Sequence, residues 1–318
     1  MTSAPGPRRA VAAALLAVGL AAAAFAAFDG TGHATRGTIA PAAPAAPAAP
    51  AARPCSHPVV AGGTTLTLQS GGRTRTAVLH LPPGIRTGER IPLVVALHGA
   101  GGSGPFMQRY SGFSVLADAK RFAVVYPSAV PPHPRWTLND DDPTAPNDVL
   151  FIRDLLNTVE QRVCVDRNRV YAAGVSNGGG LAAHLACRLA NRFAAIATVA
   201  GSYASVTTCE PQRPVSILEI HGTADQTVPY DSINDFLASW ALRDGCSGDP
   251  TYAQLQPRVS RLDWATCAAG TEVEHFRIEG GTHAWPGATP PDPGPPAPIS
   301  ATQEAWRFFA AHQRASAA

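Results

Sequence analysis

Short apolar runs alternate with helix-like segments along most of the chain. The apolar runs have the length of buried strands and lie at residues 92–97, 122–126, 169–175, 194–200, 215–220 and 272–278. The helix-like segments lie near 113–121 and at 148–162, 178–190, 231–242 and 302–313. This alternation predicts an α/β fold, in which helices cover both faces of a mostly parallel sheet. Alternating residues at 64–70 and 76–81 predict an antiparallel hairpin ahead of it.

The pentapeptide Gly174-Val175-Ser176-Asn177-Gly178 has the G-x-S-x-G pattern of a nucleophilic serine. A predicted strand precedes it and a predicted helix follows it, as this sharp turn requires. Glycines two residues before and after Ser176 let the strand and the helix pass closely. The N–H of Asn177, near the start of the helix, would then face a developing oxyanion. Taken alone, the pattern is common enough that a Gly-rich turn with an incidental serine explains it equally well.

Three further predicted strands end in residues that suit the same chemistry. The first leads into the Gly-rich segment His98–Gly104, whose N–H groups can complete an oxyanion hole. Asp225 and His283 each follow a later strand. Ser176, Asp225 and His283 occur in the chain order of an α/β-hydrolase triad, whereas other serine hydrolases use other orders. An Asp in a turn or a His on a loop is common by itself, so the order of the motifs carries the hypothesis.

Together these motifs resemble those of the polyhydroxybutyrate depolymerase/feruloyl esterase family of secreted esterases. The similarity extends over roughly residues 60–313 and lies in Leu97-His98-Gly99, Gly174–Gly179, His221–Asp225, Val228-Pro229-Tyr230 and Gly281–Gly287. The resemblance implies an α/β-hydrolase fold and a carboxylic ester hydrolase that needs no metal or organic cofactor. It also implies that the N–H of Ala100 joins that of Asn177 in the oxyanion hole.

The expected mechanism follows from these assignments. Ser176 Oγ attacks the ester carbonyl, His283 removes its proton, and Asp225 holds the imidazole. His283 then protonates the leaving alcohol, and water releases the acid from an acyl-enzyme.

Trp285 and Trp136 are the candidate substrate-binding residues. Trp285 lies two residues from His283, and an aromatic wall suits a feruloyl ring or an apolar hydroxyalkanoate chain alike. Core packing is the alternative for both tryptophans. His98 and His221 each precede a glycine at a strand end, and we expect them to shape loops through hydrogen bonds.

The first 28 residues predict an export signal. Arg8 and Arg9 precede an apolar run, and Ala24-Phe25-Ala26 matches a small-x-small cleavage site. Because the run is nearly long enough to span a membrane, an uncleaved N-terminal anchor is the alternative. Pro/Ala repeats at 41–50 predict an extended linker over 29–54, which leaves 55–318 as the catalytic domain. We therefore expect a secreted, extracellular protein that contacts a membrane only if the first segment stays uncleaved.

Six cysteines in an exported chain predict three disulfides. Proximity in the sequence favours Cys246–Cys267 and Cys187–Cys209, which leaves Cys55–Cys164, although other pairings are open.

Composition excludes several function classes. The chain has 25 Lys and Arg against 23 Asp and Glu, so its charge does not indicate a basic surface that binds nucleic acid. We expect the protein to be a monomer. No C-x-x-C or H-x-x-x-H spacing predicts a metal site. Asp140-Asp141-Asp142 lacks the spaced ligands of an EF-hand calcium loop.

Three questions stay open at this stage. The ester substrate can be a feruloyl or acetyl ester of plant cell-wall polysaccharide, or a hydroxyalkanoate polyester. A serine peptidase on the same fold would share the triad, but it usually carries a large extra domain for which the chain has no room. A non-catalytic surface or binding protein on a hydrolase scaffold would not need the complete triad, and the fold alone does not separate these classes.

Overall fold

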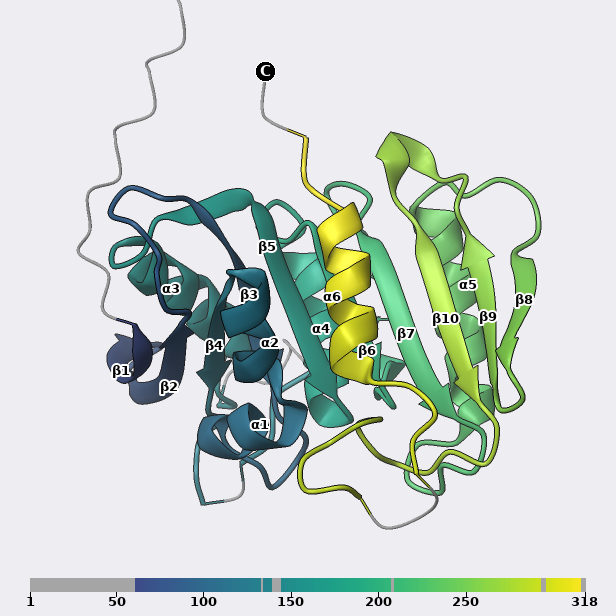
Figure 1. Cartoon of the computed structure of the whole chain (residues 1–318), viewed down its shortest axis with the longest axis horizontal. Coiled ribbons are helices and arrows are strands. Elements are labelled where there is room, and N and C mark those ends of the chain that lie inside the picture. Colours follow the sequence, from purple (N-terminus) through teal and green to yellow (C-terminus); the bar gives the residue numbers. More distant parts are fainter. Residues whose placement is uncertain (1–60, 133, 139–143, 207–208, 293–295, 316–318) are drawn as a thin grey trace, which may run out of the picture. The chain divides into compact units, whose positions relative to one another are not determined.

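A computed structural model describes residues 61–132, 134–138, 144–206, 209–292 and 296–315. In these ranges a sheet of ten strands has the order β1-β2-β4-β3-β5-β6-β7-β10-β9-β8 (Figure 1). The strands are β1 (Gly62–Ser70), β2 (Arg73–Leu81), β3 (Ile91–Leu97), β4 (Ala123–Pro127), β5 (Val165–Val175), β6 (Ala195–Val199), β7 (Ser216–Gly222), β8 (Thr251–Gln256), β9 (Val259–Trp264) and β10 (Val273–Ile278). The α-helices are α1 (Gly104–Ser111), α2 (Phe113–Lys120), α3 (Asp148–Glu160), α4 (Asn177–Arg188), α5 (Asn234–Arg243) and α6 (Ala301–Ala311). Short 3-10 helices are η1 (Ala204–Val206), η2 (Tyr230–Ile233) and η3 (Ala268–Gly270).

The centre of the sheet is parallel and its edges are antiparallel. From β4 through β3, β5, β6 and β7 to β10, neighbouring strands run in the same direction. All seven residues of β3 are buried and apolar or proline, because a central parallel strand is covered on both faces. Antiparallel partners complete the sheet, with β2 and β1 beyond β4 and with β9 and β8 beyond β10.

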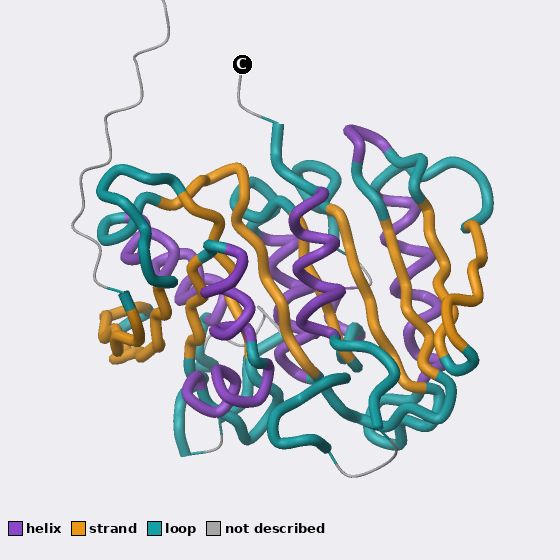
Figure 2. The backbone as a smooth tube through the Cα atoms, in the orientation of Figure 1, coloured by secondary structure: helices purple, strands orange, loops and turns teal. Residues whose placement is uncertain are grey.

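Helices cover both faces of the sheet, as Figure 2 shows. On one face α3, α4 and α5 bury side chains such as Phe151, Leu181 and Trp240 in a single apolar cluster with the strands. On the other face α1, α2 and α6 contribute Phe113 and Phe308, among others, to a second cluster. The sheet therefore separates two cores and presents the ends of its strands, rather than its faces, to solvent.

The predicted α/β-hydrolase architecture is confirmed, but the expected elements omit α1 and the β8–β9 hairpin. Helix α1 begins directly after the Gly-rich segment, with Ser103 as its N-cap and a proline in its first turn. Its start is therefore hidden among turn-forming residues. Strand β8 lies at the sheet edge with nearly all of its residues exposed, so it lacks the apolar run that reveals the central strands.

Two of the three predicted disulfides form, namely Cys187–Cys209 and Cys246–Cys267. Cys55 of the third predicted pair lies outside the described residues, as do the predicted export signal at 1–28 and the predicted linker at 29–54. Among the helices that the structure describes, none is both long and apolar enough to cross a membrane.

Candidate active site

The loops after four parallel strands carry the predicted site residues. Ser176 follows β5, Asp225 follows β7, His283 follows β10, and Ala100 lies in the loop after β3. In the sheet β3 is next to β5, and β7 is next to β10. Because parallel strands end at the same edge, these loops meet there, which is where sites form in open α/β sheets.

Ser176 has an unusual backbone conformation between β5 and α4. Its φ of 56° and ψ of −124° lie outside the regions that L-residues ordinarily adopt. Close packing requires the neighbouring glycines. A Cβ atom on Gly174 would lie 2.2 Å from the carbonyl oxygen of Gly178, and one on Gly178 would lie 2.4 Å from that of His98. Strand, helix and the loop after β3 therefore pack backbone against backbone around the serine, as the predicted turn requires.

Ser176 and His283 line the same open cleft, which has a volume of about 740 Å³. The Gly-rich loop forms the part of the wall beside the serine, since a Cβ atom on Gly99 would lie 3.4 Å from Ser176 Cβ. The other lining residues are Ala100, Gly101, Gly102, Ser103, Phe106, Tyr110, Pro134, Val175, Thr227 and Asp292. The structure thus places the predicted nucleophile and the predicted base on one cavity.

Asp225 is bonded to His283, with 2.7 Å between Asp225 Oδ2 and His283 Nδ1. Backbone N–H groups of Thr227 and Val228 donate to the other oxygen, Oδ1, at 2.8 and 2.9 Å. Asp225 is buried, whereas the side chain of His283 is 23% exposed toward the cleft that it lines. Because an ionised carboxylate only accepts, Nδ1 of His283 carries the proton, and Nε2 is the basic nitrogen of the neutral ring.

The two predicted oxyanion-hole residues lie close to the serine. Asn177 is the first residue of α4, so its N–H belongs to the unpaired first turn of a helix. The Asn177 side chain is bonded to the backbone of Trp136 instead. Its Oδ1 accepts from Trp136 N at 2.7 Å, and its Nδ2 donates to Trp136 O at 3.1 Å. Ala100 lines the cleft together with Ser176. In the described part of the chain, no acceptor is bonded to the N–H of either Ala100 or Asn177.

The prediction that Trp136 and Trp285 form walls of the substrate cleft is wrong. Each is 1% exposed, and neither lines the cleft that holds Ser176. Trp136 packs beneath the Gly-rich loop, where its Nε1 donates to the carbonyl oxygen of His98 at 2.7 Å. Trp285 points into the core, where its Nε1 donates to Thr302 Oγ1 at 3.0 Å. Trp285 is close to His283 in the sequence but does not line the cleft. Its large apolar ring can be buried because its only donor, Nε1, has a partner in the core.

Three residues that the sequence analysis missed form the aromatic and acidic part of the cleft. Phe106 is 41% exposed and stacks on Tyr110 with ring centroids 5.0 Å apart. Tyr110 Oη donates to Asp292 Oδ2 at 2.5 Å. Burial raises the pKa of Tyr110, and the bond to Asp292 raises it further, so this hydroxyl stays protonated. The i, i+4 spacing of Phe106 and Tyr110 was the available signal once α1 is recognised.

His98 supports the Gly-rich loop, in agreement with its expected role. Its Nδ1 bonds to the carbonyl oxygen of Gly99 at 2.6 Å, and its Nε2 accepts from the N–H of Ala129 at 3.1 Å. Burial lowers the pKa of His98, so the ring is neutral, which is the state that one donor and one acceptor require.

The described residues contain no group of three or more His, Cys, Asp and Glu side chains that could hold a metal ion. The acidic segment Asp140-Asp141-Asp142 lies outside the described residues.

Comparisons with known proteins identify the family and the fold of the chain. Residues 76–237 match the family model described as Esterase PHB depolymerase. NocK of Nocardia uniformis subsp. tsuyamanensis, which carries the provisional name of an esterase, is 32% identical over 286 residues, or 78% of this chain and 81% of that protein. Feruloyl esterase D of Neurospora crassa is 27% identical over 271 residues, or 79% of this chain and 87% of that protein. An acetyl xylan esterase structure from Aspergillus awamori shares the fold, with a TM-score of 0.62, 15% identity, and coverage of 78% of this chain and 100% of that one.

Proposed function

The chain belongs to the Esterase PHB depolymerase family and is a carboxylic ester hydrolase, and on that premise we propose that it works through a triad of Ser176, His283 and Asp225. One observation carries the proposal. His283 lines the same cleft as Ser176 while its Nδ1 lies 2.7 Å from Asp225. A serine, a base beside it and a buried carboxylate behind the base form the constellation that activates a hydroxyl for acyl transfer.

In the proposed mechanism, His283 Nε2 takes the proton of Ser176 Oγ as the oxygen bonds to the ester carbonyl carbon. The tetrahedral intermediate collapses when the bond to the alcohol oxygen breaks, and the imidazolium gives its proton to that oxygen. Water then repeats the sequence on the acyl-enzyme, which releases the acid and restores the serine. Asp225 stabilises the imidazolium in both steps and stays ionised.

The oxyanion of each intermediate would lie against the N–H groups of Asn177 and Ala100. Backbone donors held by packed loops do not have to reorient as charge develops, and such electrostatic stabilisation is usually the largest catalytic contribution. Trp136 and His98 hold these two loops from below through the bonds described above. We therefore assign Trp136 a supporting role, in place of the substrate contact first expected.

For the substrate, the cleft favours an ester with an aromatic acyl group. Phe106 offers a half-exposed ring backed by Tyr110, and a planar feruloyl ring can stack on it. The carboxylate of Asp292, beside the Tyr110 hydroxyl, can accept bonds from phenol or sugar hydroxyls. The relative Feruloyl esterase D supports the same substrate class by its name. We propose a feruloyl or acetyl ester of polysaccharide as substrate, with hydroxyalkanoate polyester as the alternative that the experiment below separates.

The cellular setting is part of the proposal. Residues 1–28 direct export or remain as an anchor, residues 29–54 form a linker, and residues 55–318 form the catalytic domain. Two disulfides in the described chain support an oxidising, extracellular location. We propose that the exported protein acts as a monomer.

The test compares wild-type protein with Ser176→Ala on methyl ferulate, p-nitrophenyl acetate and polyhydroxybutyrate film. We expect kcat to fall at least ~1000-fold in the variant on every ester that the wild type cleaves. Preference for methyl ferulate supports the aromatic subsite, and preference for the film supports the polyester alternative. Unchanged activity in Ser176→Ala contradicts the triad.

Phe106→Ala tests the aromatic subsite separately. We expect KM for methyl ferulate to rise about 10-fold, which corresponds to loss of one stacking contact, while KM for p-nitrophenyl acetate changes little. Val115→Ala is the matched control, because Val115 is 77% exposed and does not line the cleft. An equal rise in KM for both esters would remove Phe106 from the acyl site.

A further inference from the structure

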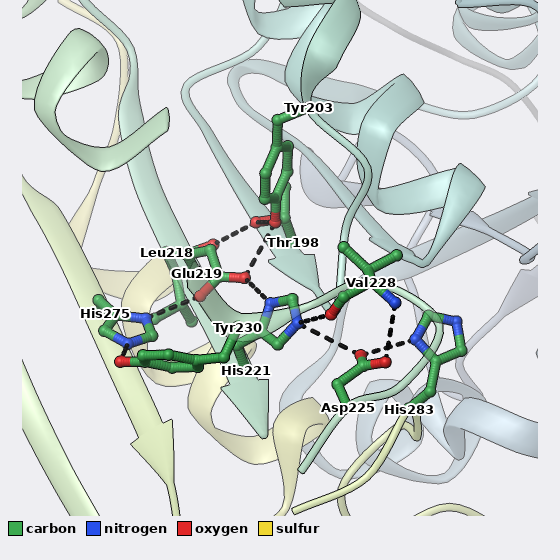
Figure 3. A network of polar contacts seen from close by, with 10 residues as sticks. All are labelled: Thr198, Tyr203, Leu218, Glu219, His221, Asp225, Val228, Tyr230, His275 and His283. Carbon is green, nitrogen blue, oxygen red and sulfur yellow. Dashed lines mark hydrogen bonds and ion pairs between the residues drawn. The ribbon is translucent and has the colours of Figure 1, made fainter. Parts of the chain in front are cut away.

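Behind Asp225 the sheet buries a chain of hydrogen-bonded ionisable groups, which Figure 3 displays. Glu219 and His221 lie in β7, and His275 lies in the neighbouring β10. All three side chains are 0% exposed. In Figure 3 His221 lies between Glu219 and Asp225, and His283 contacts Asp225 from the other side. Burying such groups is unfavourable unless their charges and hydrogen bonds are matched, so the protonation state of each can be argued from its partners.

Glu219 is surrounded by donors. Its Oε1 accepts from Tyr203 Oη at 3.0 Å and from His221 Nδ1 at 3.0 Å, and its Oε2 accepts from His275 Nδ1 at 2.7 Å. Only an ionised carboxylate can accept all three bonds. Burial by itself raises the pKa of Glu219, but the bonds and charges of His221 and His275 outweigh burial and bring this pKa down to about 2. Glu219 is therefore a buried anion.

His221 is surrounded by acceptors. Its Nδ1 lies 3.0 Å from Glu219 Oε1, and its Nε2 lies 2.9 Å from the carbonyl oxygen of Val228 and 3.2 Å from Asp225 Oδ2. A neutral imidazole has a single N–H and would leave one of these nitrogens facing an acceptor with no proton between them. Burial lowers the pKa of His221, yet the bond and charge of Glu219, with help from Val228 and Asp225, raise it above its ordinary value. Both nitrogens therefore carry protons.

The remaining groups around this pair do not compete for the proton of His221. His275 bonds to Glu219 through Nδ1 and to Tyr230 Oη through Nε2 at 2.8 Å, so both of its ring nitrogens have partners of their own. Burial raises the pKa of Tyr230 to about 12, so its hydroxyl keeps the proton that it donates. Burial likewise raises the pKa of Tyr203, so its hydroxyl stays protonated. The guanidinium of Arg277 lies over the Tyr230 ring, 5.7 Å from its centroid.

We propose that Glu219 and His221 are positioning residues for the triad. Glu219 holds a positive charge on His221, and His221 clamps Oδ2 of Asp225 in the place from which it meets His283. This inference rests on the proposed triad and extends it into the sheet. The series runs from the anion Glu219 through the cation His221 and the anion Asp225 to the base, His283.

The series has a functional consequence, because Asp225 Oδ2 is shared between two rings. It lies 3.2 Å from His221 Nε2 and 2.7 Å from His283 Nδ1. The positive charge on His221 keeps Asp225 ionised and opposes a second positive charge on His283. Loss of that charge should therefore raise the proton affinity of His283 and loosen the position of Asp225. The first effect moves a pH profile, which a purely structural role would not do.

The test reads the ring nitrogens of His221 by 15N NMR in the full-length enzyme, with the signals assigned by their absence in His221→Gln. We expect both nitrogens to keep imidazolium shifts across the pH range in which exposed histidines lose their proton, because Glu219 raises the pKa of His221. In Glu219→Gln we expect His221 to become neutral within this range. A wild-type His221 that becomes neutral over the same pH range as an exposed histidine would overturn the proposal.

Kinetics on a soluble aryl ester supply the second readout. In Glu219→Gln we expect kcat to fall about 10-fold to 100-fold with KM unchanged. A loss of this size is typical when a residue that orients a functional side chain, such as a residue bonded to a metal ligand, is removed. The acid limb of kcat/KM should move to higher pH. The double variant Glu219→Gln/His221→Gln, which keeps amide donors and acceptors without charge, should show the same displaced limb. An acid limb that stays in place in both variants contradicts the proposal.

Glu274→Gln is the matched control. Glu274 precedes His275 in β10 and is also a fully buried, ion-paired carboxylate, but its partners are Arg261 and Arg307 on the opposite face of the sheet. We expect this variant to leave the His221 signals and the acid limb unchanged. Failure of the triad itself is distinguishable, because it would appear as activity retained in Ser176→Ala, whereas the protonation of His221 is read without activity.

Discussion

The two halves of the cleft are fixed by different physical means. The nucleophile half is held by steric contact, since Gly174 and Gly178 leave no room for a Cβ atom between β5, α4 and the loop after β3. The acid–base half is held by charge, since Asp225 is fixed by two backbone N–H groups and by His221, which pairs in turn with Glu219.

This difference predicts how each half responds to change. A backbone-packed turn tolerates a change of pH but no added methyl group, because protein interiors are close-packed. A chain of buried charges can accept a substitution that keeps the volume of a side chain. Its stability and activity change, however, with each charge that is lost and with pH.

Asp225→Asn should have the largest effect. The amide keeps the shape of the side chain but can favour the wrong tautomer of His283, a change that lowers kcat about 10,000-fold in a serine protease triad. Steady-state kinetics at neutral pH, with circular dichroism to establish folding, would measure it. A loss of less than about tenfold would show that the acid–base half does not depend on this charge.

Gly178→Ala probes the steric half. Its new Cβ atom would lie 2.4 Å from the carbonyl oxygen of His98 and 2.5 Å from that of Leu97, so β3 and α4 must separate. We expect unfolding free energy to fall by about 1–3 kcal/mol and kcat to fall with it, at every pH. Gly63→Ala is the control, because a Cβ atom there meets nothing within 4 Å. Similar stability of the two variants would refute the steric account.

The Glu219–His221 pair should give a pH-dependent share of stability. Because the pKa of Glu219 is lowered from 4.5 to about 2, its contribution is present above pH 4.5 and is lost as pH falls toward 2. Because the pKa of His221 is raised above 6.5, its contribution is complete below pH 6.5 and is lost as pH rises through the raised value. The difference in Tm between wild type and Glu219→Gln/His221→Gln should therefore peak between pH 4.5 and 6.5. A difference independent of pH would contradict the charges assigned.

Asp244 offers the smallest effect and the sharpest contrast, since it is a buried carboxylate that makes no ion pair within the described chain. Its Oδ1 accepts from the N–H of Val215 at 3.1 Å, while its Oδ2 has no hydrogen-bond partner in the described chain. Burial raises the pKa of Asp244 from 3.8 to about 7, so folding is favoured at low pH and the advantage is lost as pH rises through 7. Asp244→Asn should flatten the dependence of Tm on pH between about 4 and 8, which thermal scans would reveal. An unaltered slope would mean that another group controls it.

The sequence predicted the parts of this molecule whose signals are local. The apolar run of β3 and the glycines around Ser176 are readable because a buried parallel strand and a tight turn each restrict residues that are adjacent in the chain. The order of Ser176, Asp225 and His283 added the topology.

The parts that escaped prediction depend on contacts between distant residues. Glu219 is the one acidic residue within a largely apolar strand, and its partner His275 lies 56 positions away. Asp292 reaches Tyr110 across 182 positions. Trp285 misled because a position beside the base in sequence does not determine the direction in which a ring points. Such pairings are set by the register of β7 with β10 and by loop packing, which no local pattern encodes.

Covalent trapping of the nucleophile tests the central claim most directly. Diethyl p-nitrophenyl phosphate transfers its diethylphosphoryl group to an activated serine and releases p-nitrophenolate, and peptide mass spectrometry locates the group. The account predicts one stoichiometric adduct on Ser176, formed in wild type and strongly slowed in Asp225→Asn. An adduct on another residue, or none while ester hydrolysis continues, would contradict it.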